Sequence, residues 1–421
     1  MNFNTFVVRF GLDPNNFKEI PSDPIKTDDG FIYELEEKIR KDKCPFCSSN
    51  LIDIKGYYFE SIKMTINISI KEVLRIKRVK YKCKNCGKTF TLELTGISKY
   101  CTVSNQNKIL MINDFHSPIT FSDIAKKYDV TKATTLNIFD TTFKYVKRRN
   151  MPKILCIDEF HFSSQFDQKY CCVLVDYETK KIVDIIRSRQ IEYLRDYFSH
   201  INENERSNVK YFISDMYDGY STIRNSFFPK SLYIIDLFHV IIQLTNAINQ
   251  IRTITMNHNV FKGSKEYNFM KSNWKCFLCR AEKIPNKFYT YKITGECIHY
   301  DKMVHLCCLK NHDLLNGHNI LMDLYKYSRT NTYTEACDFI EFIAKRLIES
   351  QNDILKKVGE TYNKWKPGIA SAFAKNQTNL NLSNGIAECL NNKIKTILKI
   401  SYGYSNFSRF RKRVLLIDQD F

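Results

Sequence analysis

The sequence predicts an α/β protein in which a mixed sheet flanked by helices carries a helical insertion and follows two smaller modules. Apolar runs of strand length alternate with helix-length segments after Pro152, whereas the stretch from about Ile254 to Lys375 shows helical spacing. Two Cys-x-x-Cys pairs precede both regions. With 421 residues, of which 43% are hydrophobic, the chain is long enough to bury two or three cores.

The first module is defined by Cys44, Cys47, Cys83 and Cys86, which form the two Cys-x-x-Cys pairs. Four thiolates are a ligand set for a tetrahedral structural Zn²⁺ ion. Between the pairs, apolar and polar residues alternate as in a β-ribbon with one basic face. The apolar positions are Ile62, Met64, Ile66, Ile68 and Ile70. We predict a zinc ribbon over residues 44–97; the alternative is four ordinary cysteines, and the pattern leaves open whether the ribbon touches DNA or only stabilises the fold.

A pair of short helices is predicted in the second module, over residues 98–150. Thr120 and Asp123 resemble a capping box at the start of one helix, and Thr131 caps the next. This spacing is typical of a helix-turn-helix, and a plain helical hairpin is the alternative. In a helix-turn-helix, side chains near the start of the second helix reach base edges and phosphates. The candidates are Lys132, Thr134, Thr135 and Asn137.

The charge of the chain points to a polyanionic partner. There are 64 Lys and Arg residues against 45 Asp and Glu residues, which gives a formal net charge of +19 and a pI near 9.2. The alternative is a compositional bias that leaves a basic but merely solvated surface. Since no apolar run is long enough to cross a membrane and the start lacks the order of a signal peptide, we expect a cytoplasmic protein with no membrane partner.

The predicted core begins with a strand that ends at Asp158, continues with a two-stranded hairpin, and reaches a fourth strand that ends at Asp215. A further helix and strand follow. This β-β-β-α-β-α-β order is that of an RNase H-like fold, in which the first and fourth strands are neighbours. Asp158 and Asp215 would then lie side by side at one sheet edge. We assign residues 151–253 and 376–421 to the core and residues 254–375 to a helical insertion.

Glu388 is the third candidate carboxylate. It lies on a predicted helix whose apolar residues, Ile386, Leu390 and Ile394, recur at four-residue spacing and would dock the helix on the sheet. Three carboxylates are suitable ligands for Mg²⁺ or Mn²⁺, and two such ions can activate an attacking oxygen and stabilise a leaving one. Singly, each residue is more often a turn or surface residue. Together they favour phosphodiester cleavage or transfer.

From the first Cys-x-x-Cys pair to the C-terminus, the sequence resembles the DDE transposases of the ISL-three group of bacterial insertion sequences. The blocks that carry this resemblance are Ile157–Phe160, Ser214–Tyr220, Asp236–Val240 and Ser383–Lys395, with Gly403, Phe407 and Phe410-Arg411. The resemblance implies a zinc-binding N-terminus, a helix-turn-helix that reads terminal inverted repeats, and Asp158, Asp215 and Glu388 as the metal-binding triad. Two departures are Cys389, where Gly is usual, and Lys399-Ile400, where Lys-Arg is usual.

We therefore expect a nucleoid-associated bacterial transposase that binds the ends of its element, cleaves them with Mg²⁺, and joins a 3′ hydroxyl to double-stranded target DNA as a synaptic homodimer. The alternatives are a DNA-binding protein with a silent core and a nuclease or resolvase on the same fold. The insertion would serve dimer contact and DNA clamping. Its own Cys-x-x-Cys pair, Cys276 and Cys279, falls in a helical pattern and is expected to supply core thiols rather than half a zinc site.

Overall fold

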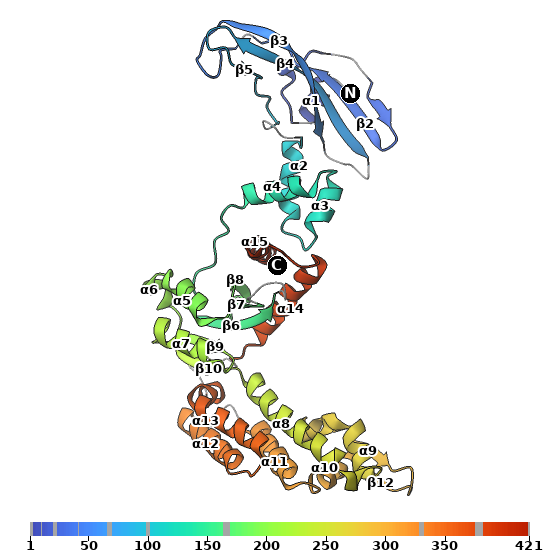
Figure 1. Cartoon of the computed structure of the whole chain (residues 1–421), viewed down its shortest axis with the longest axis vertical. Helices are drawn as coiled ribbons and strands as arrows, with labels where there is room; N and C mark the ends of the chain where they lie inside the picture. Colours follow the sequence, from blue (N-terminus) through green and yellow to red (C-terminus); the bar gives the residue numbers. More distant parts are fainter. Residues whose placement is uncertain are drawn as a thin grey trace. The chain divides into compact units, whose positions relative to one another are not determined.

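The computed structural model describes residues 3–9, 11–19, 23–40, 42–64, 70–97, 102–162, 169–327, 332–374 and 382–419 (Figure 1). The chain forms two compact units. The first comprises residues 1–147 and 396–421, and the second comprises residues 148–395.

The N-terminal part of the first unit is a twisted sheet built around a long antiparallel ribbon. Its elements are α1 (Phe3–Arg9), β1 (Ile25–Thr27), β2 (Gly30–Glu36), β3 (Ile52–Lys63), β4 (Lys71–Cys83) and β5 (Thr89–Phe90). The strand order is β1-β2-β4-β3, and β5 pairs with β4. Ile62, Leu74 and Ile76 are fully buried, as expected for alternating residues on the inner face of the ribbon. Ile66 and Ile68 of the predicted pattern lie outside the described residues.

The helical part of the first unit contains α2 (Asn105–Asp114), α3 (Phe121–Lys127) and α4 (Lys132–Thr142). Both caps lie where the sequence places them. Thr120 Oγ1 accepts from the N–H of Asp123 at 2.9 Å, and Thr131 Oγ1 accepts from the N–H of Thr134 at 3.1 Å. The turn between α3 and α4 is made by Asp129, whose φ of 50° lies in the left-handed region.

A helix from the far end of the sequence completes this part. In α15 (Phe407–Gln419), the guanidinium of Arg413 donates to the carbonyls of Ser117 and Ile119 at 2.8 and 2.7 Å. Arg413 is only 1% exposed and lies over the rings of Phe115 and Phe121. Arg409 pairs with Asp140 of α4 at 2.6 Å. These contacts explain why residues 396–421 group with the first unit, whereas the sequence assigned the whole of 376–421 to the core.

Replacing Arg413 with Ala should loosen α3 and α4. Removing the guanidinium takes away the donors to the carbonyls of Ser117 and Ile119 and leaves a cavity between two rings, a loss of about 3 kcal/mol. Hydrogen exchange of the α3 and α4 amides is the measurement, and their protection should fall by roughly two orders of magnitude. Lys412→Ala, at a neighbouring position of α15, is the control. Equal protection in the two variants would contradict this role of Arg413.

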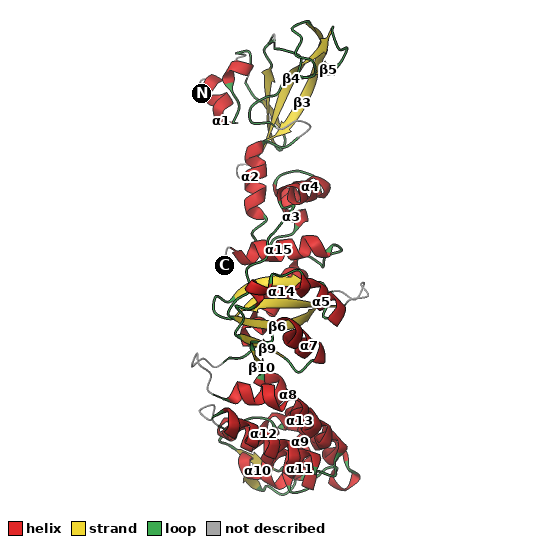
Figure 2. Ribbon diagram, turned by 90° about the vertical axis from the view of Figure 1, so that its left-hand side faces the viewer, coloured by secondary structure: helices red, strands yellow, loops and turns green. Residues whose placement is uncertain are grey.

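The second unit is organised around a five-stranded mixed sheet of order β10-β9-β6-β7-β8 (Figure 2). Its strands are β6 (Ile154–His161), β7 (Tyr170–Asp176), β8 (Lys181–Ile186), β9 (Tyr211–Ser214) and β10 (Leu232–Ile235). The helices α5 (Ile191–Ser199), α6 (Glu203–Arg206) and α7 (Asp218–Phe227) lie between these strands in the sequence. Leu194, Phe198, Tyr220 and Ile223 pack α5 and α7 against the sheet. The succession of elements is the predicted one, and the first and fourth strands are neighbours.

The insertion begins directly after β10. It contains α8 (Leu237–Asn257), α9 (Lys265–Ser272), β11 (Phe288–Thr290), β12 (Cys297–His299), α10 (Tyr300–Cys308), α11 (His312–Lys326), α12 (Tyr333–Ile348) and α13 (Asp353–Phe373). Helix α13 packs closely against β10 at Gly368. A Cβ atom added at this position would lie only 2.6 Å from Ile235 Cγ1 and would clash with it. Among the described helices, none has both the length and the apolar character needed to cross a membrane.

Candidate functional site

Three aspartates lie at the same level of three neighbouring parallel strands: Asp215 and Asp236 directly follow β9 and β10, whereas Asp158 lies inside β6, just beyond its pairing with β9. The expected end of the first strand at Asp158 is thereby corrected, because β6 continues to His161 in its antiparallel pairing with β7. The β6–β9 register pairs Cys156 with Ile213, and the β10–β9 register pairs Ile235 with Ser214. Continuing both registers along the strands brings Asp158, Asp215 and Asp236 to one row. The carboxyl ends of parallel strands are a common position for ligand sites in α/β proteins. This edge of the sheet, with its three aspartates, is called the acidic edge below.

Asp158 and Asp215 differ in how their oxygens are satisfied. Asp158 Oδ1 accepts from the N–H of Glu159 at 2.8 Å, and Oδ2 accepts from Asn391 Nδ2 at 2.7 Å. Asp215 Oδ1 is buried without a hydrogen-bond partner in the described part of the chain. Burial raises the pKa of Asp158, and burial together with the nearby charge of Glu159 raises the pKa of Asp215 to about 6. A buried carboxylate oxygen without a donor suits a hard divalent cation, so the residues fit Mg²⁺ or Mn²⁺.

Asp236 and His239 add a second polar pair to the acidic edge. Asp236 caps α8 and lies 3.1 Å from His239 Nδ1. The hydrogen bond to Asp236 raises the pKa of His239, and the charges of Asp215 and Asp158 raise it further. In turn, the charge of the His239 imidazolium lowers the pKa of Asp158 and of Asp215, against the larger effect of burial. Asp236 and His239 belong to a block of the family resemblance, but neither was expected to have a role in the site. An Asp-x-x-His spacing directly after an apolar strand is the sequence signal that could have identified them.

Glu388 lies in the first turn of α14 (Gly385–Ile400), and its side chain is exposed. Ala387, Leu390 and Ile394 are buried, whereas Ile386 of the predicted stripe is only half-buried. The carboxylates of Asp158, Asp215 and Glu388 do not all come within 4.8 Å of one another; within the described ranges, only a cysteine group meets that distance. The structure thus brings the two aspartates together at the sheet edge and places Glu388 on a helix attached to it.

Two asparagines attach α14 to the acidic edge, and the sequence analysis missed both. Asn384 Nδ2 donates to the carbonyl of Ile157 at 3.1 Å, and its backbone N–H donates to Asp236 Oδ1 at 3.3 Å. Asn391 Nδ2 donates to Asp158 and also to the carbonyl of Glu159 at 3.2 Å. Both asparagines are 2% exposed. The available signal was one amide, that of Asn391, on an otherwise apolar face of α14.

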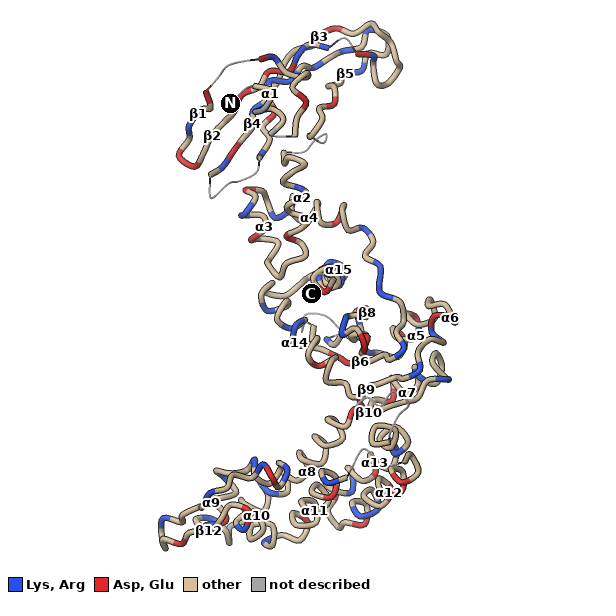
Figure 3. Tube along the Cα trace, turned by 180° about the vertical axis from the view of Figure 1, so that it is seen from behind, with Lys and Arg blue, Asp and Glu red and all other residues tan. Residues whose placement is uncertain are grey.

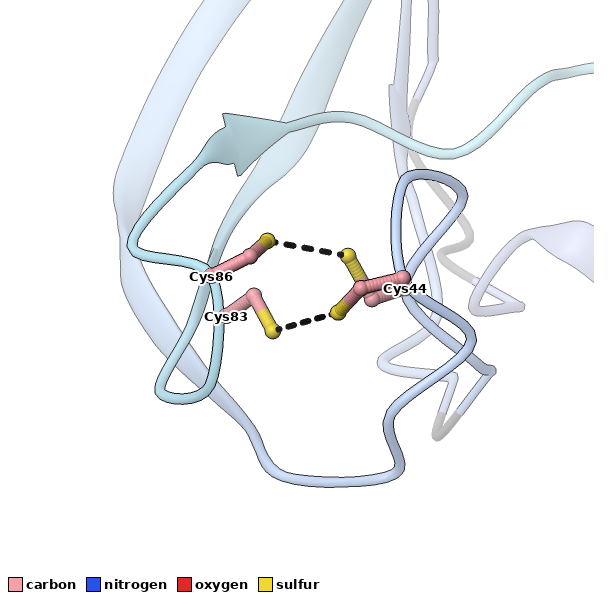
Figure 4. Close-up of side chains that lie close together, drawn as sticks. Cys44, Cys83 and Cys86 are labelled. Carbon is pink, nitrogen blue, oxygen red and sulfur yellow. Dashed lines mark hydrogen bonds between the residues drawn. The ribbon is translucent and has the colours of Figure 1, made fainter.

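The four cysteines of the N-terminal module gather as predicted (Figure 4). The Sγ atoms of Cys44 and Cys86 lie 3.7 Å apart, and those of Cys47 and Cys83 lie 3.6 Å apart. Four sulfurs placed about 2.3 Å from a tetrahedral Zn²⁺ ion are about 3.8 Å from one another, so the group fits zinc. The backbone N–H of Cys86 lowers the pKa of Cys83 to about 6, which favours the thiolate that a metal requires.

Only part of the predicted DNA-reading set lies on one surface of α4. Lys132 and Asn137 are exposed, and Thr134 is half-buried. Thr135 is fully buried, and its hydroxyl donates to the carbonyl of Thr131 at 3.3 Å. The expectation that Thr135 reaches DNA therefore needs correction, because its position on the helix faces the hydrophobic core rather than solvent.

These features describe a protein with a four-cysteine group that could hold a metal ion and an acidic edge on a mixed α/β sheet. A family model described as Transposase, for the ISL-three group of DDE transposases, matches residues 155–414. The match covers more than half of the chain, so the protein belongs to the ISL-three family of transposases. The resemblance found in the sequence is thereby confirmed. No curated protein matches the chain.

Replacing Asp215 with Asn should stabilise the Mg²⁺-free second unit. Because the native pKa of about 6 lies above the usual value of 3.8, ionisation of Asp215 removes stability as the pH rises from about 4 through 6. Allowing for solvent screening, Asp215→Asn should raise the free energy of unfolding by about 1–2 kcal/mol at pH 7.5, and the gain should shrink toward pH 4. Urea unfolding followed by tryptophan fluorescence measures this, since Trp274 and Trp365 both lie in the second unit.

The control is Asp196→Asn, a carboxylate whose side chain is 79% exposed, which should leave the free energy of unfolding unchanged. If Asp215→Asn instead lowers the free energy of unfolding at pH 7.5, the ionised carboxylate of Asp215 does not destabilise the fold.

Purified protein should contain one Zn²⁺ ion per chain, and Cys83→Ser should lose it. Three thiolates hold zinc far less tightly than four, and structural zinc contributes directly to folding. Metal content by mass spectrometry and alkylation of the released thiols give the readout. Cys389→Ser, which changes an exposed cysteine outside the cluster, should retain the ion. A wild-type protein without metal at these cysteines would contradict the assignment.

Proposed function

We propose that this transposase binds the terminal inverted repeats of its own element and cleaves and joins DNA through Asp158, Asp215 and Glu388 with Mg²⁺ or Mn²⁺. The observation that carries the proposal is the acidic edge, where Asp158 in β6 and Asp215 after β9 stand at one level of adjacent parallel strands and one buried oxygen of Asp215 has no partner in the described structure. An aspartate that only ended a strand would satisfy both oxygens with water or turn N–H groups.

The triad residues have separate roles in this proposal. Asp158 and Asp215 hold the cation from the sheet, and Glu388 approaches from α14, which Asn384 and Asn391 attach to the same edge. A bound Mg²⁺ would polarise a phosphodiester and activate a hydroxyl for in-line attack. The raised pKa of Asp215 means that the free site has unfavourable negative charge, so a cation is bound more favourably there than at an ordinary surface carboxylate.

In this proposal α4 recognises the DNA ends. The side chains that would contact the DNA are Lys132, Asn137 and the half-buried Thr134. The basic run after α4, with Lys144, Lys147, Arg148 and Arg149, is visible as blue segments between α4 and β6 in Figure 3. A net charge of +19 supports contact with phosphates along the DNA. The order of strands and helices in the second unit supports an RNase H-like core. Because two ends are handled in one transposition event, the active form in this proposal is a homodimer.

Asp158→Asn should separate binding from cleavage. The substitution removes one negative charge from the proposed metal site without changing the size of the side chain. We expect unchanged affinity for a duplex carrying the inverted repeat in a gel-shift assay. Strand cleavage with Mg²⁺ should fall at least a thousandfold, as is typical when a charge acting in the transition state is lost. If cleavage is unaffected, the core is silent or uses other residues, which is the competing reading of this chain.

The double substitution Lys132→Ala and Asn137→Ala should have the opposite effect. Loss of a phosphate contact and a base contact should weaken end binding by at least tenfold, and discrimination against unrelated duplex should fall. Lys357→Ala, which removes an exposed lysine from α13, is the charge control and should leave specific binding unchanged. Full affinity in the double variant would exclude α4 as the reading helix.

A further inference from the structure

Two asparagines, one directly before α14 and one within it, are buried where the helix meets the sheet. Asn384 precedes the first residue of α14, and Asn391 stands on the helix face that otherwise buries Ala387 and Ile394. A buried amide without partners costs several kcal/mol, so its hydrogen bonds must be made to specific atoms. The side-chain amide of Asn391 donates hydrogen bonds to Asp158 Oδ2 and to the backbone carbonyl of Glu159. The polar contacts of this helix are thus directed at the acidic edge.

We propose that Asn391 is a positioning residue that presents the Asp158 carboxylate to the metal and fixes the register of Glu388 on α14. The inference rests on the proposed function of the acidic edge. It adds a residue that acts through Asp158 and holds the catalytic helix in place.

The hydrogen bonds around Asp158 support the first half of this role. A carboxylate offers about four lone-pair positions on its two oxygens. The N–H of Glu159 occupies one position on Oδ1, and Asn391 Nδ2 occupies one on Oδ2. Two donors on different oxygens prevent rotation of the carboxylate and leave about two lone pairs for a cation. Asn391 Oδ1 is buried without a partner among the described residues, and the water of a hydrated cation can donate to such an acceptor.

Helix geometry supports the second half. Glu388 precedes Asn391 by three residues, so their Cβ atoms are about 5–6 Å apart on one side of α14. A shift of the helix by one residue would rotate this side by about 100° and carry Glu388 away from the edge. Burial of Ala387, Leu390 and Ile394 resists such a large slip but leaves smaller shifts of the helix open, because hydrophobic contacts are not directional. The hydrogen bond of Asn391 to Asp158 is directional and fixes a single register.

The test measures Mn²⁺ binding to the full-length protein by electron paramagnetic resonance, without DNA and without turnover. Asn391→Leu keeps the side-chain size and suits the apolar face, so the unit should fold, but it removes the donor. We expect Mn²⁺ affinity to fall about tenfold and cleavage to be partly restored by raising Mn²⁺. Asn391→Gln, which keeps an amide donor on a longer side chain, should recover part of the lost affinity. Cys389→Ala, an exposed position in the same turn, should bind Mn²⁺ like the wild type.

The variants separate the possible failures. If Asp158→Ala binds Mn²⁺ as well as the wild type, the proposed metal site itself is wrong. If Asp158→Ala loses Mn²⁺ but Asn391→Leu retains it, only the role of Asn391 is overturned. Equal losses in the Leu and Gln variants would also overturn that role, because the amide donor would then not be the cause. Tryptophan-monitored urea unfolding of each variant shows whether the second unit is folded during the measurement.

Discussion

The parallel pairing of β6, β9 and β10 is the constraint on which the candidate active site depends. Side chains at matching positions of parallel strands are brought to one level by the backbone hydrogen bonds, without any contact between the side chains themselves. The strands are buried on both faces: Leu155 and Phe212 lie on one face, Cys156 and Ile213 lie on the other, and all four are fully buried. A one-residue slip would therefore force both sides of the sheet to repack at once. The hydrophobic core therefore fixes the register, and the register fixes the row of aspartates. The three aspartates are therefore held at one level by buried apolar side chains of the strands and not by contacts between the carboxylates.

This arrangement has an energetic cost in the absence of a ligand. Asp158, Asp215 and Asp236 lie at one edge, and their charge is offset in part by His239, Arg189 and hydrogen-bond donors such as the amide of Asn391. Removing such charges from a fold commonly stabilises it while abolishing function, since active sites are rarely optimised for stability. The surrounding core compensates through large buried aromatic clusters, such as Phe198 with Phe228 and Phe212.

Much of this architecture follows from local signals in the sequence. Thr120 and Thr131 mark helix starts, because a side-chain oxygen before an apolar periodic stretch satisfies free N–H groups whatever the rest of the fold does. Cys44 and Cys83 begin knuckles whose spacing is dictated by metal geometry. The order of strands in the core and the position of Asp215 directly after its strand also follow from the sequence, whereas the first strand continues past Asp158 to His161. Each of these features depends on neighbours within a few residues.

The features that could not be predicted depend on distant partners. Nothing near Asn391 indicates that its amide meets Asp158, which lies 233 residues earlier in the chain. Thr135 seemed free to face DNA because helix periodicity alone did not show which side of α4 meets Phe115 and Phe121. Glu388 was placed on the right helix, but the rotamer of a long exposed side chain is not set by packing. Long-range polar contacts leave no local signature, and they decide the details of this site.

The attachment of α15 to α3 and α4 has a consequence for how the protein is made. Ser117 leaves the ribosome 296 residues before Arg413, the side chain that caps its carbonyl. At typical rates of synthesis this interval is roughly 15 to 60 s. During that time, α3 and α4 lack their buried guanidinium and the apolar side of α15. The first unit of a nascent chain therefore completes its packing only after all of the second unit, residues 148–395, has been synthesised.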